Sequence, residues 1–252
     1  MSGPGLIEVP TGATARAVFT TREGGSSAGP FASLNLGADG GDDDARTRAN
    51  RVALCAALGI DPARVQVNRQ VHGAAVRAAG GAEHRGRFAG ALRGWPEADA
   101  LTTDEAGTPL LVLGADCVPV LLWRRDAQGV AAAHAGWRGL AAGVVEAAAR
   151  AIGPPGRLGA AIGPAIGPCC YPVSAGVRTT FAARFGGDVV VGDAVDLAGA
   201  ARAALVAAGV PDGAIQAVTS CTACEEGRFF SHRRDGVCGR QAGVVWEVGE
   251  AA

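Results

Sequence analysis

The chain has 252 residues, 48% of them hydrophobic and 19% charged, a balance typical of a folded globular protein. Its 23 basic and 24 acidic residues leave a net charge of -1, which argues against a protein built to bind the phosphate backbone of nucleic acid. All of the basic residues are arginines, so a mechanism through a lysine Schiff base is excluded.

The hydrophobic pattern predicts strands and helices in alternation along the chain. A strand is predicted at residues 15–21 and a Gly/Ser-rich loop at residues 22–37. Acidic N-cap residues at positions 42–44 then begin a helix at residues 45–58, which ends at Gly59. Residues 65–76 are β-like, and short apolar runs at residues 110–113, 118–123 and 130–134 predict buried strands.

The C-terminal half predicts three helices, at residues 138–152, 174–185 and 196–208, and two strands, at residues 215–218 and 242–248. There is no repeat of fixed period and no linker long enough to divide the chain. We therefore expect a single mixed α/β domain over residues 1–252.

The chain also carries signs of its compartment. Residues 1–10 lack the cationic and apolar regions of a signal peptide, and no apolar stretch has the length of a membrane span. Seven cysteines, an odd number without an export signal, favour reduced thiols. We expect a cytoplasmic protein that does not bind membranes.

Three potential metal ligands stand at ends or junctions of predicted strands: His72, Cys117 and His134. Side chains at strand ends flanked by Gly or Pro can converge on one cleft. Two imidazoles and one thiolate are good ligands for Zn²⁺ and leave the fourth tetrahedral position for water or substrate. The spacings of 45 and 17 residues match no short-loop ligand rule, so ordinary core roles for these residues stay open.

Two further cysteine pairs stand later in the chain. Cys221 and Cys224 form a CxxC motif without a second CxxC, which argues against a zinc ribbon. The adjacent Cys169 and Cys170 follow a Gly-Pro turn. We expect both pairs to serve packing, with a redox role of the CxxC as the alternative.

Arginines beside these motifs are candidates for anion binding. Arg138 opens a predicted helix, where backbone N–H groups favour an anion. Bidentate contacts to phosphate could come from Arg22, Arg51, Arg233 and Arg234. A surface salt bridge is the alternative for each of these side chains.

Long motifs surround all these residues. The central ones are QVHG at residues 70–73, ADCVPVL at 115–121, HAGWRG at 134–139 and IGPAIGPCCY at 162–171. The outer ones are FTTR at residues 19–22, SLNLG at 33–37, FFSHRRDG at 229–236 and GRQ at 239–241. Together they resemble the laccase-domain family, also called the YfiH or multicopper polyphenol oxidase family, over about residues 19–246. One departure is His232, where the family more often has Tyr.

The resemblance implies a fold, a metal and an activity. The fold is an α/β (α+β) layered α-β-β-α sandwich with mixed sheets, and the metal is zinc on His72, Cys117 and His134. Family members are named purine nucleoside phosphorylase, polyphenol oxidase or peptidoglycan editing factor. The candidate substrate or phosphate ligands are Arg22, Asn35, Arg51, Arg138 and Arg233.

We therefore expect an enzyme of purine nucleosides, monomeric or homodimeric, with His72, Cys117 and His134 as its catalytic residues. It would cleave adenosine- or inosine-type nucleosides with phosphate to the base and ribose 1-phosphate. Water activated by zinc could also attack C6 of adenosine and release ammonia, giving inosine.

Three alternatives remain. Cys117 and His134 could act as nucleophile and base of a hydrolase of peptidoglycan precursors. A multicopper oxidase is disfavoured, since it needs many imidazoles and the chain has four His and a single Met, although one copper could occupy the three-ligand site. A metal that only stabilises the fold would require a fourth protein ligand.

Overall fold

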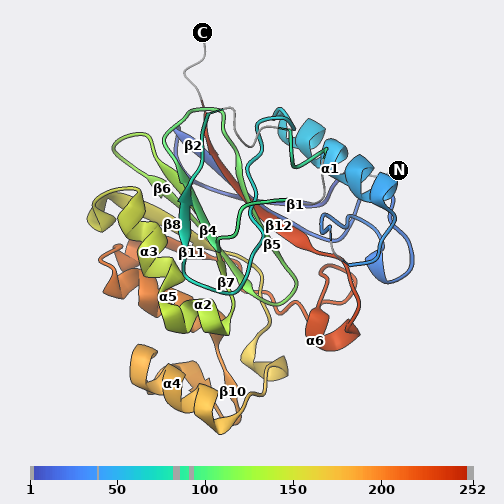
Figure 1. Cartoon of the computed structure of the whole chain (residues 1–252). Helices are drawn as coiled ribbons and strands as arrows, with labels where there is room; N and C mark the ends of the chain where they lie inside the picture. Colours follow the sequence, from blue (N-terminus) through green and yellow to red (C-terminus); the bar gives the residue numbers. More distant parts are fainter. Residues whose placement is uncertain (1–2, 39, 82–85, 91–93, 249–252) are drawn as a thin grey trace.

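Figure 1 shows a computed structural model that describes residues 3–38, 40–81, 86–90 and 94–248. Its main strands are β1 (Leu6–Val9), β2 (Ala15–Thr20), β3 (Val76–Ala78), β4 (Ala100–Thr103), β5 (Leu110–Gly114), β6 (Val118–Arg124), β7 (Val130–Ala135), β8 (Leu158–Ile162), β9 (Val190–Val191), β10 (Ala194–Val195), β11 (Ile215–Ala217) and β12 (Gln241–Glu247). Its α-helices are α1 (Asp44–Leu58), α2 (Trp137–Ala142), α3 (Val144–Ala151), α4 (Ala175–Phe185), α5 (Leu197–Ala207) and α6 (His232–Asp235).

The strands form two large sheets and one short ribbon. One sheet is antiparallel, with the strand order β1-β2-β12-β5. The other has the order β11-β8-β6-β7-β4-β3 and is mixed, because β11 runs parallel to β8 and β3 parallel to β4. Strands β9 and β10 pair separately as an antiparallel ribbon.

Three hydrophobic layers hold these elements together. Neighbouring residues of one strand face opposite sides, so Val18 packs with Leu54 of α1, whereas Phe19 packs with Leu121 between the two sheets. On the far side of the six-stranded sheet, Val120 belongs to the core that includes residues of α2, α3 and α5. Helix α1 and the helices α2, α3 and α5 accordingly lie on opposite sides (Figure 1), which confirms the α-β-β-α sandwich.

Most predicted elements are present. Helix α1 follows Asp43, whose carboxylate accepts hydrogen bonds from two backbone N–H groups of the first turn. The helix ends at Gly59, which has the left-handed φ of 67° that glycine tolerates. Within the part of the chain that the structure describes, no helix is both long and apolar enough to cross a bilayer.

Two predictions are wrong in detail. The helix predicted at residues 138–152 is divided into α2 and α3 by Gly143, whose φ of 90° does not continue an α-helix. In the β-like stretch at residues 65–76, Gln66 and Arg69 form isolated bridges, and only Val76 belongs to a strand, β3. The interruption lies at residues 71–73, as expected around His72 and Gly73, where the backbone N–H groups donate to the carboxylate of Asp99.

The centre of the six-stranded sheet positions the candidate site. Strands β6 and β7 are antiparallel, so Pro119 at the start of β6 pairs with His134 near the end of β7. Strand β4 flanks β7 on its other side, and the N–H of His134 donates to the backbone carbonyl of Asp99, which precedes β4, at 2.7 Å. Residues far apart in the sequence therefore meet at one end of three adjacent strands.

Candidate active site

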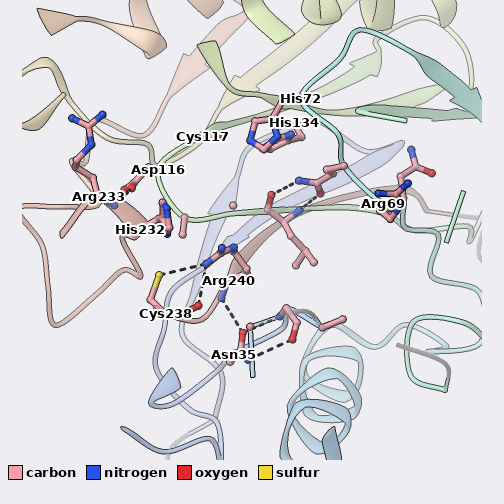
Figure 2. Close-up of a pocket in the computed structure, with 18 of the residues that line it drawn as sticks. Asn35, Arg69, His72, Asp116, Cys117, His134, His232, Arg233, Cys238 and Arg240 are labelled. Atoms are coloured by element: carbon pink, nitrogen blue, oxygen red, sulfur yellow. Dashed lines mark hydrogen bonds between the residues drawn. The ribbon is translucent and has the colours of Figure 1, made fainter. Parts of the chain in front are cut away.

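The three expected metal ligands converge in the structure (Figure 2). Nitrogen or sulfur atoms of His72, Cys117 and His134 all lie within 4.8 Å of one another. The two imidazole rings meet edge to face, with their centroids 4.9 Å apart. A divalent cation could thus be held by all three side chains at once, and this arrangement is a possible metal site.

Two of these three residues lie at or next to a position with an unusual backbone conformation. His72 has a φ of 61° and Asp116, directly before Cys117, has a φ of 92°, values that non-glycine residues rarely adopt. The turn at Asp116 is held by its carboxylate, which accepts hydrogen bonds from the Thr222 hydroxyl and the Arg233 N–H, both at 2.7 Å. A strained backbone conformation persists only where surrounding contacts hold it, and these two hydrogen bonds hold the turn at Asp116.

A residue that the sequence analysis missed, Asp99, supports both histidines. It is completely buried, and its Oδ1 lies 2.9 Å from Nδ1 of His134. The same carboxylate accepts the backbone N–H groups of Val71, His72 and Gly73 at 3.2, 2.9 and 2.6 Å. The sequence did offer one signal for Asp99: an acidic residue stands directly before the buried strand β4, and a buried carboxylate requires hydrogen-bond partners.

The electrostatics of the site couple the thiol to an imidazole. Burial alone would raise the pKa of Cys117, but the charge of His134 and hydrogen bonds from both histidines lower it to about 6. Burial opposes the charged form of His134, but the Cys117 thiolate and Asp99 raise its pKa to about 9. The pKa of Asp99 is lowered, since hydrogen bonds from His134 and Gly73 outweigh its desolvation. Near neutral pH, the metal-free site therefore favours a thiolate beside an imidazolium.

The glycines of the HAGWRG motif allow this close packing. A Cβ at Gly136 would lie 2.9 Å from the Cys117 sulfur and 3.0 Å from Cδ2 of His72. A Cβ at Gly139 would lie 3.0 Å from the carbonyl oxygen of Gly73. Glycine at both positions therefore lets strand β7 and helix α2 approach the ligands.

The three ligands line a cavity of about 490 Å³. Aromatic side chains of Trp95, Trp137 and Tyr171 form part of its walls, and His232 from α6 is also part of the lining. Its arginines are Arg69, Arg138, Arg233 and Arg240. Aromatic and arginine side chains around one cavity suit a planar ligand that carries or accompanies an anion.

Two of the expected anion-binding arginines lie in this cavity. Arg138 is exposed, with its guanidinium carbon 4.5 Å from the ring centre of Trp137. Arg233 stacks at 4.6 Å over the ring of Tyr171 and donates to the carbonyl of Pro172. Arg69 and Arg240 are cavity residues that the sequence analysis did not single out.

The other arginines are not among the cavity residues. Arg51 is completely buried and donates to the carbonyls of Leu36 and Phe88, a role in folding. Arg22 donates to the carbonyls of Ala32 and Glu226. Arg234 donates to the carbonyls of residues 222 and 223 and forms an ion pair with Asp235.

Asn35 lines the cavity, yet its side chain is engaged with the protein. Its Oδ1 accepts the N–H groups of Gly37 and Arg240, both at 2.9 Å. Its Nδ2 donates to Asp42 at 2.9 Å. The residue thereby fastens the loop after β2 to the segment that carries Arg240 (Figure 2).

Comparisons with known proteins agree with this architecture. The family model described as multi-copper polyphenol oxidoreductase laccase matches residues 16–247. Purine nucleoside phosphorylase ORF3 of Streptomyces griseus is 43% identical, over 94% of this chain and 96% of its own. Purine nucleoside phosphorylase YfiH of Escherichia coli is 38% identical, over 92% of this chain and 93% of its own.

A solved structure shares the whole fold. The crystal structure of YlmD from Geobacillus stearothermophilus matches with a TM-score of 0.89 and 37% identity, over 98% of each chain. The resemblance carried by the sequence motifs is thus confirmed at the level of sequence and of structure. The chain belongs to the laccase-domain family, whose model is described as multi-copper polyphenol oxidoreductase laccase.

Proposed function

We propose that this protein is a zinc-dependent purine nucleoside phosphorylase that also deaminates adenosine. The observation that carries the proposal is the convergence of three potential metal ligands in a cavity that aromatic and arginine side chains also line. The relatives from Streptomyces griseus and Escherichia coli, both named purine nucleoside phosphorylase, support the substrate class.

The donor set fits zinc. Imidazole and thiolate groups are both good zinc ligands, and catalytic zinc sites have three protein ligands and a fourth position for water or substrate. Asp99 bonded to His134 completes the carboxylate–histidine pair that commonly orients such a ligand. When bound, zinc would supply Lewis-acid chemistry. Multicopper chemistry needs more imidazoles than the four His of this chain, although a single copper ion could use the same donors.

The cavity walls suit both substrates of phosphorolysis. Tyr171 and Trp137 offer faces against which a purine can stack. Burial raises the pKa of Tyr171, as does the Cys117 thiolate, whereas the charges of Arg233 and Arg138 oppose this rise. Both guanidinium groups thus act on one part of the cavity, where they could hold phosphate.

The proposed reactions balance without a redox step. In phosphorolysis, a phosphate oxygen bonds to C1′ of the ribose while the bond from C1′ to the purine nitrogen breaks. The purine leaves with the electron pair and takes up the proton that the hydrogen phosphate loses, and Arg138 and Arg233 orient the phosphate. In deamination, water adds at C6 of adenosine and ammonia leaves, which yields inosine.

A second candidate function has one specific observation in its favour. The site has a potential nucleophile in Cys117, a potential base in His134 and a carboxylate that orients this base in Asp99. The Cys117 pKa of about 6 favours the thiolate. A thiol hydrolase of peptidoglycan precursors could use this array. The third donor, His72, has no role in such a mechanism and favours the metal.

Product analysis tests the choice. Purified, zinc-loaded protein is incubated with adenosine or inosine, with and without phosphate, and the products are separated by chromatography. We expect the free base to form only when phosphate is present, and inosine to form from adenosine when phosphate is absent. The variants Cys117→Ser and His134→Ala should stay folded and give neither product. Absence of turnover by the zinc-loaded protein would refute the proposal and favour the hydrolase.

A further inference from the structure

Four cysteines from two distant segments form a second cluster, and none of them is a cavity residue. Cys169 and Cys170 end the short helix η3 (Pro168–Cys170), and Cys221 and Cys224 lie in the turn after β11. Their four sulfur atoms all lie within 4.8 Å of one another. The fold thus brings the adjacent pair Cys169 and Cys170 to the CxxC motif, a convergence that the sequence analysis did not predict.

The distances between sulfur atoms suit one tetrahedral ion. The sulfur of Cys224 lies 3.4 Å from that of Cys170 and 3.6 Å from that of Cys169. In a tetrahedron with zinc–sulfur bonds of about 2.3 Å, neighbouring sulfurs are about 3.8 Å apart. A disulfide would involve only two of these atoms, and all four are free thiols in the structure. We propose that the four cysteines bind one zinc ion as a closed tetrathiolate site.

The backbone around the cluster supports this assignment. The N–H of Gly167 donates to the sulfur of Cys221 at 3.2 Å, a contact that stabilises a thiolate ligand. The N–H groups of Cys224 and Glu225 both donate to the carbonyl of Cys221, which makes the tight turn between the two ligands. Four thiolates around Zn²⁺ carry two net negative charges, and Arg234 donates to the carbonyls at positions 222 and 223 of this turn.

The site would brace one wall of the active cavity. Tyr171, a cavity residue, follows Cys170 directly. Thr222, between the other two ligands, donates its hydroxyl to Asp116 at 2.7 Å, and Asp116 precedes Cys117. One ion bound to both segments would therefore hold Tyr171 and the turn at Asp116 in a fixed relation. A site with four protein ligands has no open position, so its role would be structural.

Metal content tests the proposal independently of any enzymatic activity. The full chain is purified under reducing conditions and its metals are counted by inductively coupled plasma mass spectrometry. We expect two zinc ions per wild-type chain, one in Cys117→Ser, one in a Cys221→Ser/Cys224→Ser variant, and two in the control Cys55→Ala. The proposal would be overturned if the wild type held a single zinc ion and the Cys221→Ser/Cys224→Ser variant retained it. It would also be overturned if the second metal were iron.

Alkylation of the wild type avoids dependence on a variant that could misfold. Cys169 and Cys224 are exposed, so iodoacetamide can reach and modify both when no metal is bound. We expect both to be protected in the purified protein and to react after a chelator is added, while the buried Cys55 reacts only on unfolding. Immediate modification of Cys169 and Cys224, or a disulfide among the four found by peptide mapping, would contradict the site.

Discussion

Asp99 and His134 form a buried carboxylate–imidazole pair, with 2.9 Å between Oδ1 and Nδ1. The same carboxylate accepts the N–H groups of the loop that carries His72, so one side chain determines where both histidines lie. The geometry of the candidate metal site therefore depends on a residue that is not itself one of the three proposed ligands.

Replacement of Asp99 should weaken both the metal site and the fold. In Asp99→Asn, the amide cannot accept as many hydrogen bonds as the carboxylate, so we expect a loss of about 2 kcal/mol in unfolding free energy, measured with urea. Metal affinity, measured by competition with a chelator, should fall by roughly 10- to 100-fold. The exposed Asp188→Asn serves as the control and should change neither quantity. Unchanged metal affinity in Asp99→Asn would show that His134 is oriented by other contacts.

Gly136→Ala should abolish metal binding while the fold survives. The added methyl group would lie 2.9 Å from the Cys117 sulfur, whereas the φ of -75° at this position is open to alanine. We expect a correctly folded protein by circular dichroism that lacks the metal of this site. Gly213→Ala is the matched control, because its Cβ would meet nothing within 4 Å. Full metal content in Gly136→Ala would mean that the ligands can move apart.

The reactivity of Cys117 should depend on pH in a specific way. In metal-free protein, its pKa of about 6 makes the thiolate dominant above pH 6, and His134 stays protonated up to about pH 9. Alkylation of Cys117, followed by peptide mass spectrometry, should rise through about pH 6 and then level off. His134→Ala should move this midpoint upward. A midpoint near 9, the ordinary value for a thiol, would show that no ion pair forms.

Replacement of Arg138 or Arg233 should affect the binding of phosphate more than that of the nucleoside. If Arg138 and Arg233 hold phosphate, Arg233→Met should raise the KM for phosphate by roughly tenfold, since a charge-assisted hydrogen bond contributes about 1.5–3 kcal/mol. Zinc content and the KM for nucleoside should stay unchanged. Arg150→Met, on the exposed side of α3, is the control. Equal effects on both KM values would assign Arg233 to the purine instead.

Many local features follow from the sequence alone. Helix α1 is marked by the acid at its N-cap and the glycine at its end, and strands β5, β6 and β7 by their short apolar runs. These signals are reliable because capping, turn formation and burial depend on residues close together in the chain. The motifs around His72, Cys117 and His134 also identify the family.

Only the tertiary structure decides which distant residues meet. The pairing of β4, β7 and β6 places Asp99 beside His134, and the turns after β8 and β11 place Cys170 beside Cys224. The sequence made Arg51 a candidate phosphate ligand, but its guanidinium group instead donates hydrogen bonds to backbone carbonyls inside the core. Sequence spacing carries no information about these contacts, because they depend on strand order and on how the two sheets pack.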